Sequence, residues 1–301
     1  MTKSNFLPPP SPPSPPSPPS PPSPPSPPSP HPPIPPLSTI IIWAIAIFVT
    51  SIFLWILSDI IWHGAGQISW EFLTSEPQKA GREGGIGSII VSTLLILGVC
   101  IVVAVPIGVG AALFLSEFTD NESTFGRIIR RSLDVLAAVP SIVFGLFGNV
   151  FFCQTLGLGF SILSGGLTIT CMVLPILIRE TEEGFRAVPR EYKLAAAALA
   201  YSRTTTIWQL LLPAATPGIL VGLVLGIGRG IAETAALIFT SGYVDRMPES
   251  LLDSGRSLSV HIFDLSMNVS GGDSNAYASA LVLLILLLII NTTAALIGNK
   301  Q

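Results

Sequence analysis

The stretch GSIIVSTLLILGVCIVVAVPIGVGAALFL, residues 87–115, contains no charged side chain. An α-helix of about 20 apolar residues, rising 1.5 Å per residue, crosses a hydrocarbon core ~30 Å thick. This stretch is therefore long enough and apolar enough to be a transmembrane helix. It decides the fold class, because other parts of the chain repeat its pattern.

The composition of the whole chain agrees with a membrane protein. Hydrophobic residues make up 49% of the 301 residues and charged residues only 11%, whereas a soluble domain carries about 25% charged residues. By length and hydropathy the sequence predicts six spans, at 38–61, 87–115, 132–153, 161–178, 212–241 and 277–298. Little of the chain is left over, so we expect one all-α membrane domain over residues 38–301.

The positive charges predict an orientation. With a cytoplasmic N-terminus, most Lys and Arg side chains fall in the inner loops and at the termini, and the outer loops hold only Lys79, Arg82, Arg246 and Arg256. The positive-inside rule then places both termini of this multi-pass membrane protein in the cytoplasm. The net charge of −3 and the lack of a basic patch give no indication of a nucleic-acid partner.

Residues 1–37 are rich in proline and serine, with SPP repeating from Ser11 through Ser29. Proline fixes φ and lacks an amide donor, so this segment favours extended polyproline II over helix or strand. We expect a disordered cytoplasmic tail. It is either a docking site for a proline-binding partner or a spacer.

The inner loop of residues 189–213 is expected to be ordered. Pro189 suits the first turn of a helix, and the alanine-rich run in EYKLAAAALAYSRTTTIWQLLLPAATPG, residues 191–218, has strong helix propensity. A loop with this much helical preference predicts a structured platform rather than a linker.

This platform resembles a loop of ABC importer permeases. That family carries E-A-A, three residues, G, nine residues, I, one residue and L-P, and the same spacing here selects Leu194, Ala195, Ala196, Ala200, Leu210, Leu212 and Pro213. Leu194 stands at the acidic position and Ala200 at the glycine position. The resemblance implies a type I importer permease of six transmembrane helices, whose coupling helices dock on an ATP-binding subunit.

Other stretches resemble the phosphate-specific branch of that family. They are AVPIGVGAALFLSEF at 104–118, AAVPSIVFGLFG at 137–148, LPILIRETEEGFRAVPRE at 174–191, and residues 254–284. In the second of them, Pro140 and Ser141 are expected to interrupt a helix. The resemblance implies ATP-driven phosphate import with a homologous second permease subunit, two cytoplasmic ATP-binding subunits and an external phosphate-binding protein. Sulfate or molybdate remains an alternative substrate.

The segment RGIAET, residues 229–234, also fits the phosphate permeases and suggests Arg229, Glu233 and Thr234 as pathway residues. On a helix, Arg229 and Glu233 would lie at i, i+4 and project from one face. The nearby Gly222, Gly226, Gly228 and Gly230 predict a tightly packed helix seam. Three interpretations stay open: mutual neutralisation, phosphate binding by Arg229, and a switch in which Arg229 exchanges Glu233 for the anion.

The chain lacks the P-loop pattern G-x-x-x-x-G-K-[ST], so we predict a transport subunit without an ATPase site of its own. Cys100, Cys153 and Cys171 have no ligand-like spacing and are expected to pack as small apolar residues, and we expect no metal or cofactor. His261 is expected to be a loop or docking residue. The rival hypothesis is a self-sufficient secondary anion transporter that uses the Arg–Glu pair.

Overall fold

The computed structural model describes residues 36–120 and 123–298. The tail predicted over residues 1–37 lies outside the described residues, apart from the two that begin the first helix. Residues 52–301 form one compact unit, and residues 36–51 belong to a separate one. The arrangement given below concerns the described part of the larger unit.

Nearly every element is helical. The long helices are α1 Pro36–Gly64, α3 Gly87–Glu117, α6 Ile162–Ala187, α9 Leu212–Ile231 and α12 Asp273–Gly298. Shorter helices are α2 Trp70–Thr74, α4 Thr124–Ala137, α5 Ser141–Gly148, α7 Arg190–Ala198, α8 Arg203–Thr206, α10 Ala235–Ile238 and α11 Leu258–Met267. There are also two single 3₁₀ turns, η1 Ala65–Gln67 and η2 Lys79–Gly81, and two π-helical turns, η3 Asn149–Thr155 and η4 Ile207–Leu211. Two short antiparallel strands are β1 Pro77–Gln78 and β2 Glu83–Gly84.

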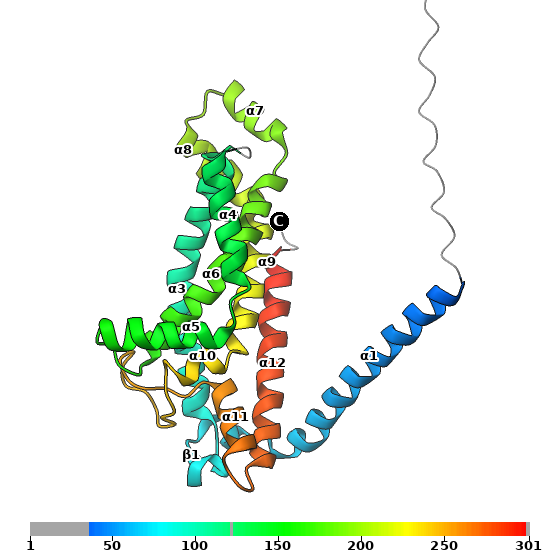
Figure 1. Ribbon diagram of the computed structural model, residues 1–301, viewed down its shortest axis with the longest axis vertical. Coiled ribbons are helices and arrows are strands. Elements are labelled where there is room, and N and C mark those ends of the chain that lie inside the picture. Colours follow the sequence, from blue (N-terminus) through cyan, green and yellow to red (C-terminus); the bar gives the residue numbers. More distant parts are fainter. Residues whose placement is uncertain (1–35, 121–122, 299–301) are drawn as a thin grey trace, which may run out of the picture. The chain divides into compact units, whose positions relative to one another are not determined.

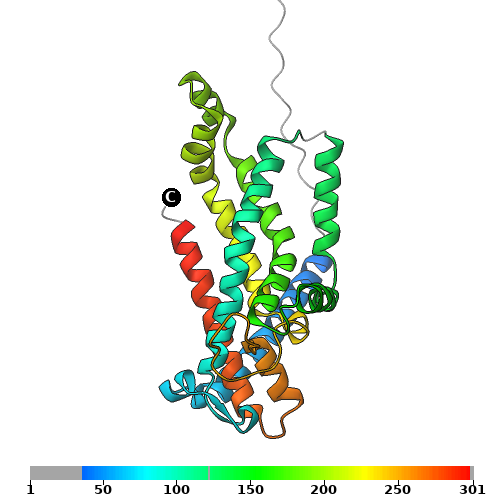
Figure 2. The same cartoon turned by 90° about the vertical axis from the view of Figure 1, so that its left-hand side faces the viewer.

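Helix α6 lies at the centre of this unit. It packs along α3 on one side and along α9 on another, and α12 runs beside α9 (Figures 1 and 2). The core between α3 and α6 is formed by fully buried apolar side chains that include Ile96, Ala104, Ile169, Met172 and Leu177. The platform α7–α8 lies at one end of the unit and α11 with β1 at the other (Figure 1).

Glycines at every fourth position bring α9 onto α6. These are Gly218, Gly222, Gly226 and Gly230, and a Cβ on Gly218 would lie 2.4 Å from the Cα of Gly184 in α6. Small residues at this spacing allow two backbones to touch. The predicted seam therefore exists, except that Gly228 faces open space and does not belong to it.

Five helices in the described residues are long and apolar enough to cross a membrane, with α8, η4 and α9 forming one of them over Arg203–Ile231. The span predicted over 132–153 is interrupted, as expected from Pro140 and Ser141, and the described residues have six spans if this bent pair counts as one. The structure has α4 followed by α5–η3, bent by 97° at the break. Pro140 causes the break, because a proline disfavours the helical conformation of the residue before it. The span expected at 212–241 also ends early, at Ile231.

Helix α7 ends in a left-handed turn at Ala200, whose φ is 52°. The amide of Tyr201 donates to the carbonyl of Ala196 and the amide of Ala200 to that of Ala197, each at 3.0 Å. These two bonds are those of a Schellman cap, which usually places glycine at the left-handed position. Alanine there is strained by its Cβ.

We predict that Ala200→Gly stabilises the protein, because glycine removes a left-handed strain of about 1 kcal/mol. Thermal unfolding of the purified chain in detergent should show a Tm higher by about 2 °C. The matched control is Ala197→Gly, inside α7, which should lower the Tm because glycine weakens a helix interior. Equal losses of Tm in both variants would contradict the strain at Ala200.

A buried cluster of charged side chains lies at the end of the unit opposite the α7–α8 platform. Arg256 is 8% exposed, and its Nε donates to the carbonyl of Tyr243 at 2.9 Å while its Nη1 lies 3.2 Å from Asp264 Oδ2. The Nδ1 atom of His261 lies 3.4 Å from Arg256 Nη1. Burial, helped by the Arg256 charge and opposed by Asp264, lowers the pKa of His261 to about 4. The expected loop or docking histidine is thus a fully buried side chain of α11.

This burial makes the stability sensitive to acid. Between pH 6.5 and about 4 the unfolded chain binds a proton at His261 that the folded chain excludes, so the free energy of unfolding falls as the pH drops, by about 3 kcal/mol in total. His261→Gln should flatten the fall of the Tm between pH 7 and pH 5. Parallel pH profiles of the wild type and His261→Gln would refute this explanation.

Candidate functional site

The residues of RGIAET lie where α9 ends. Arg229 is in the last turn of the helix, Ala232 caps it, and Glu233 and Thr234 follow in the break before α10. The prediction that Arg229 and Glu233 share one helix face is therefore wrong. The helix stops between them, so their side chains are not held at helical spacing.

Glu233 has partners of its own. Its Oε1 accepts a hydrogen bond from the amide of Ala236 at 3.1 Å, and its backbone carbonyl accepts one from Ser259 Oγ at 2.6 Å. A carboxylate in this position satisfies an amide at the start of a helix that has no partner within the helix. Glu233 therefore fixes the start of α10 and ties the break to α11.

Arg229 is half-buried and, among the described residues, has no hydrogen bond or ion pair, including none with Glu233. Its neighbour Gly230 packs against Ile169 of α6, so the backbone that carries Arg229 is fixed by the glycine seam. A cation in an apolar span is costly and usually marks a substrate or ion pathway. Arg229 therefore stays a predicted pathway residue.

The corner made by Pro140 and Ser141 supports the same region. It directs α5 across the bundle onto α10, where a Cβ on Gly145 would lie 2.8 Å from the Cα of Ala236. Asn149 Nδ2 also donates to the carbonyl of Phe239 at 2.8 Å. The broken span thus positions α10, and with it the break that holds Glu233.

The residues selected by the coupling-loop spacing lie on α7, at its cap and at the junction of η4 and α9. Ala196 is buried, whereas Leu194 is 60% exposed. The platform presents further exposed apolar side chains: Tyr192, Leu199, Tyr201 and Trp208. Such a concentration of exposed large apolar residues at one end of the unit is typical of a protein interface.

One ion pair ties this platform to the bundle. Lys193 Nζ in α7 lies 2.6 Å from Glu117 Oε1, at the last residue of α3. A cavity of about 290 Å³ beside the pair is lined by Phe118, Tyr201, Arg203 and Ile207, among others. Because the pair is partly buried, it is screened less than an exposed one.

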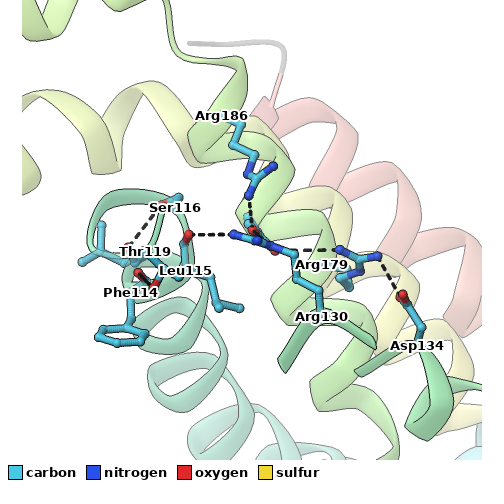
Figure 3. A network of polar contacts seen from close by, with 10 residues as sticks. Phe114, Leu115, Ser116, Thr119, Arg130, Asp134, Arg179 and Arg186 are labelled. Carbon is cyan, nitrogen blue, oxygen red and sulfur yellow. Dashed lines mark hydrogen bonds and ion pairs between the residues drawn. The ribbon is translucent and has the colours of Figure 1, made fainter. Parts of the chain in front are cut away.

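Near the platform lies a cluster of charges that was not predicted from the sequence, here called the Glu182 cluster. It consists of Glu182, Arg179 and Arg186 of α6 with Arg130 and Asp134 of α4 (Figure 3). Glu182 is 2% exposed. The sequence could have indicated only the part of the cluster on α6, where Arg179 and Arg186 stand three residues before and four residues after Glu182. The contacts with Arg130 and Asp134 could not be predicted, because these residues lie far away in the sequence.

The family model described as "Binding-protein-dependent transport system inner membrane component" matches residues 104–299. A probable ABC transporter permease protein of Bacillus subtilis (strain 168), YqgI, is 32% identical over 268 residues, covering 84% of this chain and 91% of that protein. A protein of Mycobacterium tuberculosis (strain ATCC 25618 / H37Rv) named phosphate transport system permease protein PstA 1 is 34% identical over 71% of this chain and 70% of its own length.

Solved structures show the same fold. A chain of the MetNI methionine ABC transporter, in an inward-facing conformation, has a TM-score of 0.55 with 14% identity and covers 72% of this chain and 94% of its own. A chain of a bacterial ABC transporter for the polysaccharide alginate has a TM-score of 0.59 with 12% identity, over 88% of this chain and 95% of its own. The predicted all-α importer permease fold is confirmed, and the chain belongs to the inner membrane components of binding-protein-dependent transport systems.

Proposed function

We propose that this chain is a permease subunit of an ATP-driven importer that moves inorganic phosphate across the cytoplasmic membrane. Membership of the family indicates binding-protein-dependent transport. The substrate is supported by relatives whose names state phosphate transport, such as the M. tuberculosis protein at 34% identity. The single structural observation that carries the proposal is Arg229, whose guanidinium has no partner among the described residues and lies in an otherwise apolar span.

Arg229 is suited to an oxyanion. A guanidinium presents several donors in a planar fork, which matches two oxygens of a phosphate and keeps its charge at any physiological pH. Glu233 is engaged by α10, so binding an anion at Arg229 requires no ion pair to be broken. This arrangement favours anion binding over the two interpretations that need an Arg229–Glu233 pair.

Glu233 and Thr234 have a different role in this proposal. They form the wall of the pathway at the break between α9 and α10, next to the last turn of α9. The carboxylate orders the break through Ala236, and Thr234 contributes a hydroxyl at the same level. Arg229 therefore attracts the anion, and the residues of the break between α9 and α10 form the wall of the pathway beside it.

The energy for transport would come from outside the chain. The exposed apolar residues of the α7–α8 platform form the surface for a cytoplasmic ATP-binding subunit, two of which serve the complex. A homologous second permease subunit completes the pathway, and an external phosphate-binding protein delivers the anion. Both termini lie in the cytoplasm in this arrangement, and the chain itself carries no ATPase site.

We predict that Arg229→Gln lowers phosphate uptake at least tenfold, because a hydrogen-bonded charge contact is worth roughly 1.5–3 kcal/mol. The importer, with all its subunits, is reconstituted in liposomes, and uptake of labelled phosphate is measured with internal ATP. The matched control is Arg82→Gln in an exposed outer loop, which should leave uptake within twofold of the wild type.

The same liposomes separate the alternatives. Competition by sulfate or molybdate as strong as that by unlabelled phosphate would reassign the substrate to another oxyanion. Uptake by this chain alone, without ATP or partner subunits, would instead identify a secondary transporter. Near-normal uptake by an assembled Arg229→Gln complex would remove Arg229 from the pathway.

A further inference from the structure

The Glu182 cluster lies in the last turns of α6, just before the platform. One carboxylate oxygen, Glu182 Oε1, accepts two charged hydrogen bonds, from Arg130 Nε at 2.8 Å and from Arg186 Nη2 at 2.7 Å. Figure 3 shows the side chains of Arg130 and Arg186 converging on the same point. Arg130 is nearly buried, with 12% of its side chain exposed, so this pair is poorly screened by solvent.

Arg130 connects three helices. From α4 it reaches Glu182 of α6 with Nε, and with Nη2 it donates to the carbonyl of Leu115 in α3 at 3.1 Å. The rigid fork of a guanidinium can serve two acceptors in different directions, whereas a lysine ammonium acts from one point at the end of a flexible chain. The simultaneous contact of one side chain with α3 and α6 therefore depends on arginine at position 130.

A second pair fixes the register of α4 against α6. Arg179 Nη2 lies 2.8 Å from Asp134 Oδ1, about one turn along α4 from Arg130. Arg179 Nη1 also lies 3.9 Å from Glu182 Oε2, an oxygen that is buried without a hydrogen-bond partner in the described residues. Two ion pairs thus join the same two helices, and one carboxylate oxygen remains free to accept a further bond.

The cluster lies directly next to the α7–α8 platform. Only Val188 and Pro189 separate α6 from α7, and Lys193 of α7 pairs with Glu117 at the end of α3. The ends of α3, α4, α6 and α7 are therefore linked by charged contacts on one side of the bundle. From there α4 leads through Pro140 to α5, and α5 packs on α10, which begins at the Glu233 break.

An anion site is a poor explanation for these arginines. The free oxygen of Glu182 is an acceptor, so it would repel a phosphate oxygen placed beside it. Packing alone is also a weak explanation, because apolar residues commonly replace buried ion pairs without loss of stability. Unlike apolar contacts, hydrogen-bonded ion pairs have a fixed geometry and fixed partners. They are therefore suited to holding helices in one relative orientation.

We propose that Glu182 is a positioning residue of the transport cycle, which locks α4 and the end of α3 to α6. Movement delivered at the α7–α8 platform then displaces these helices as one body and reaches the α4–α5 corner and the Glu233 break. Without the lock, the platform moves while α4 lags behind. This inference rests on the proposed function, since it assumes that the platform receives movement from an ATP-binding subunit.

The test compares phosphate transported with ATP hydrolysed. The complete importer is reconstituted with Glu182→Gln or with Arg130→Lys, which keeps the charge but loses the fork. Both variants should assemble and hydrolyse ATP within twofold of the wild-type rate, and the phosphate moved per ATP should fall at least fivefold. The matched control is Glu83→Gln, which removes the exposed pair with Lys79 and should leave the ratio unchanged.

The outcomes separate the two proposals. If the wild-type complex moves no phosphate, the proposed function fails. If it does and both variants keep the wild-type ratio, only the role of Glu182 is overturned. Failure of both variants to assemble would assign the cluster a purely structural role and would also overturn the inference. If Glu182→Gln alone fails to assemble, Arg130→Lys decides the result.

Discussion

The close contact between α9 and α6 is the constraint on which the rest of the structure depends. Glycines at every fourth position of α9 place its backbone against Gly184, Leu177, Val173 and Ile169 of α6. A side chain at any of these glycines would separate the helices, because packed interiors do not absorb an added methyl group without movement. The contact places the last turn of α9 against α6, and so it determines the positions of Arg229 and the break that follows it.

The two ends of α6 are held by different kinds of contact. At the end near the platform, charged pairs join α3, α4, α6 and α7. Toward the other end, α5 and α10 are packed through glycines and a hydrogen bond from Asn149. The bend at Pro140 connects these regions, because one side of the corner is held by Glu182 and the other packs on α10. The proposed site at the end of α9 is in this way connected by packed helices to the proposed docking surface at the other end of the bundle.

The sequence predicted the spans that depend on hydropathy alone, such as 87–115, because the bilayer imposes one length on every such helix. It also located the break at Pro140 and the helical platform within 189–213. It failed where local geometry decides: the helix end at Ile231 separates Arg229 from Glu233, although their spacing suggested one face. The Glu182 cluster was out of reach, because Arg130 meets Glu182 only through tertiary packing.

In the proposed site, Arg229 is held free for an anion and is not paired with Glu233. A double-mutant cycle tests it directly, using thermal stability of the assembled complex with Arg229→Gln, Glu233→Gln and both changes. We expect the two effects to add, with a coupling free energy below about 0.5 kcal/mol. A coupling above about 1 kcal/mol, as expected for a buried ion pair, would contradict it.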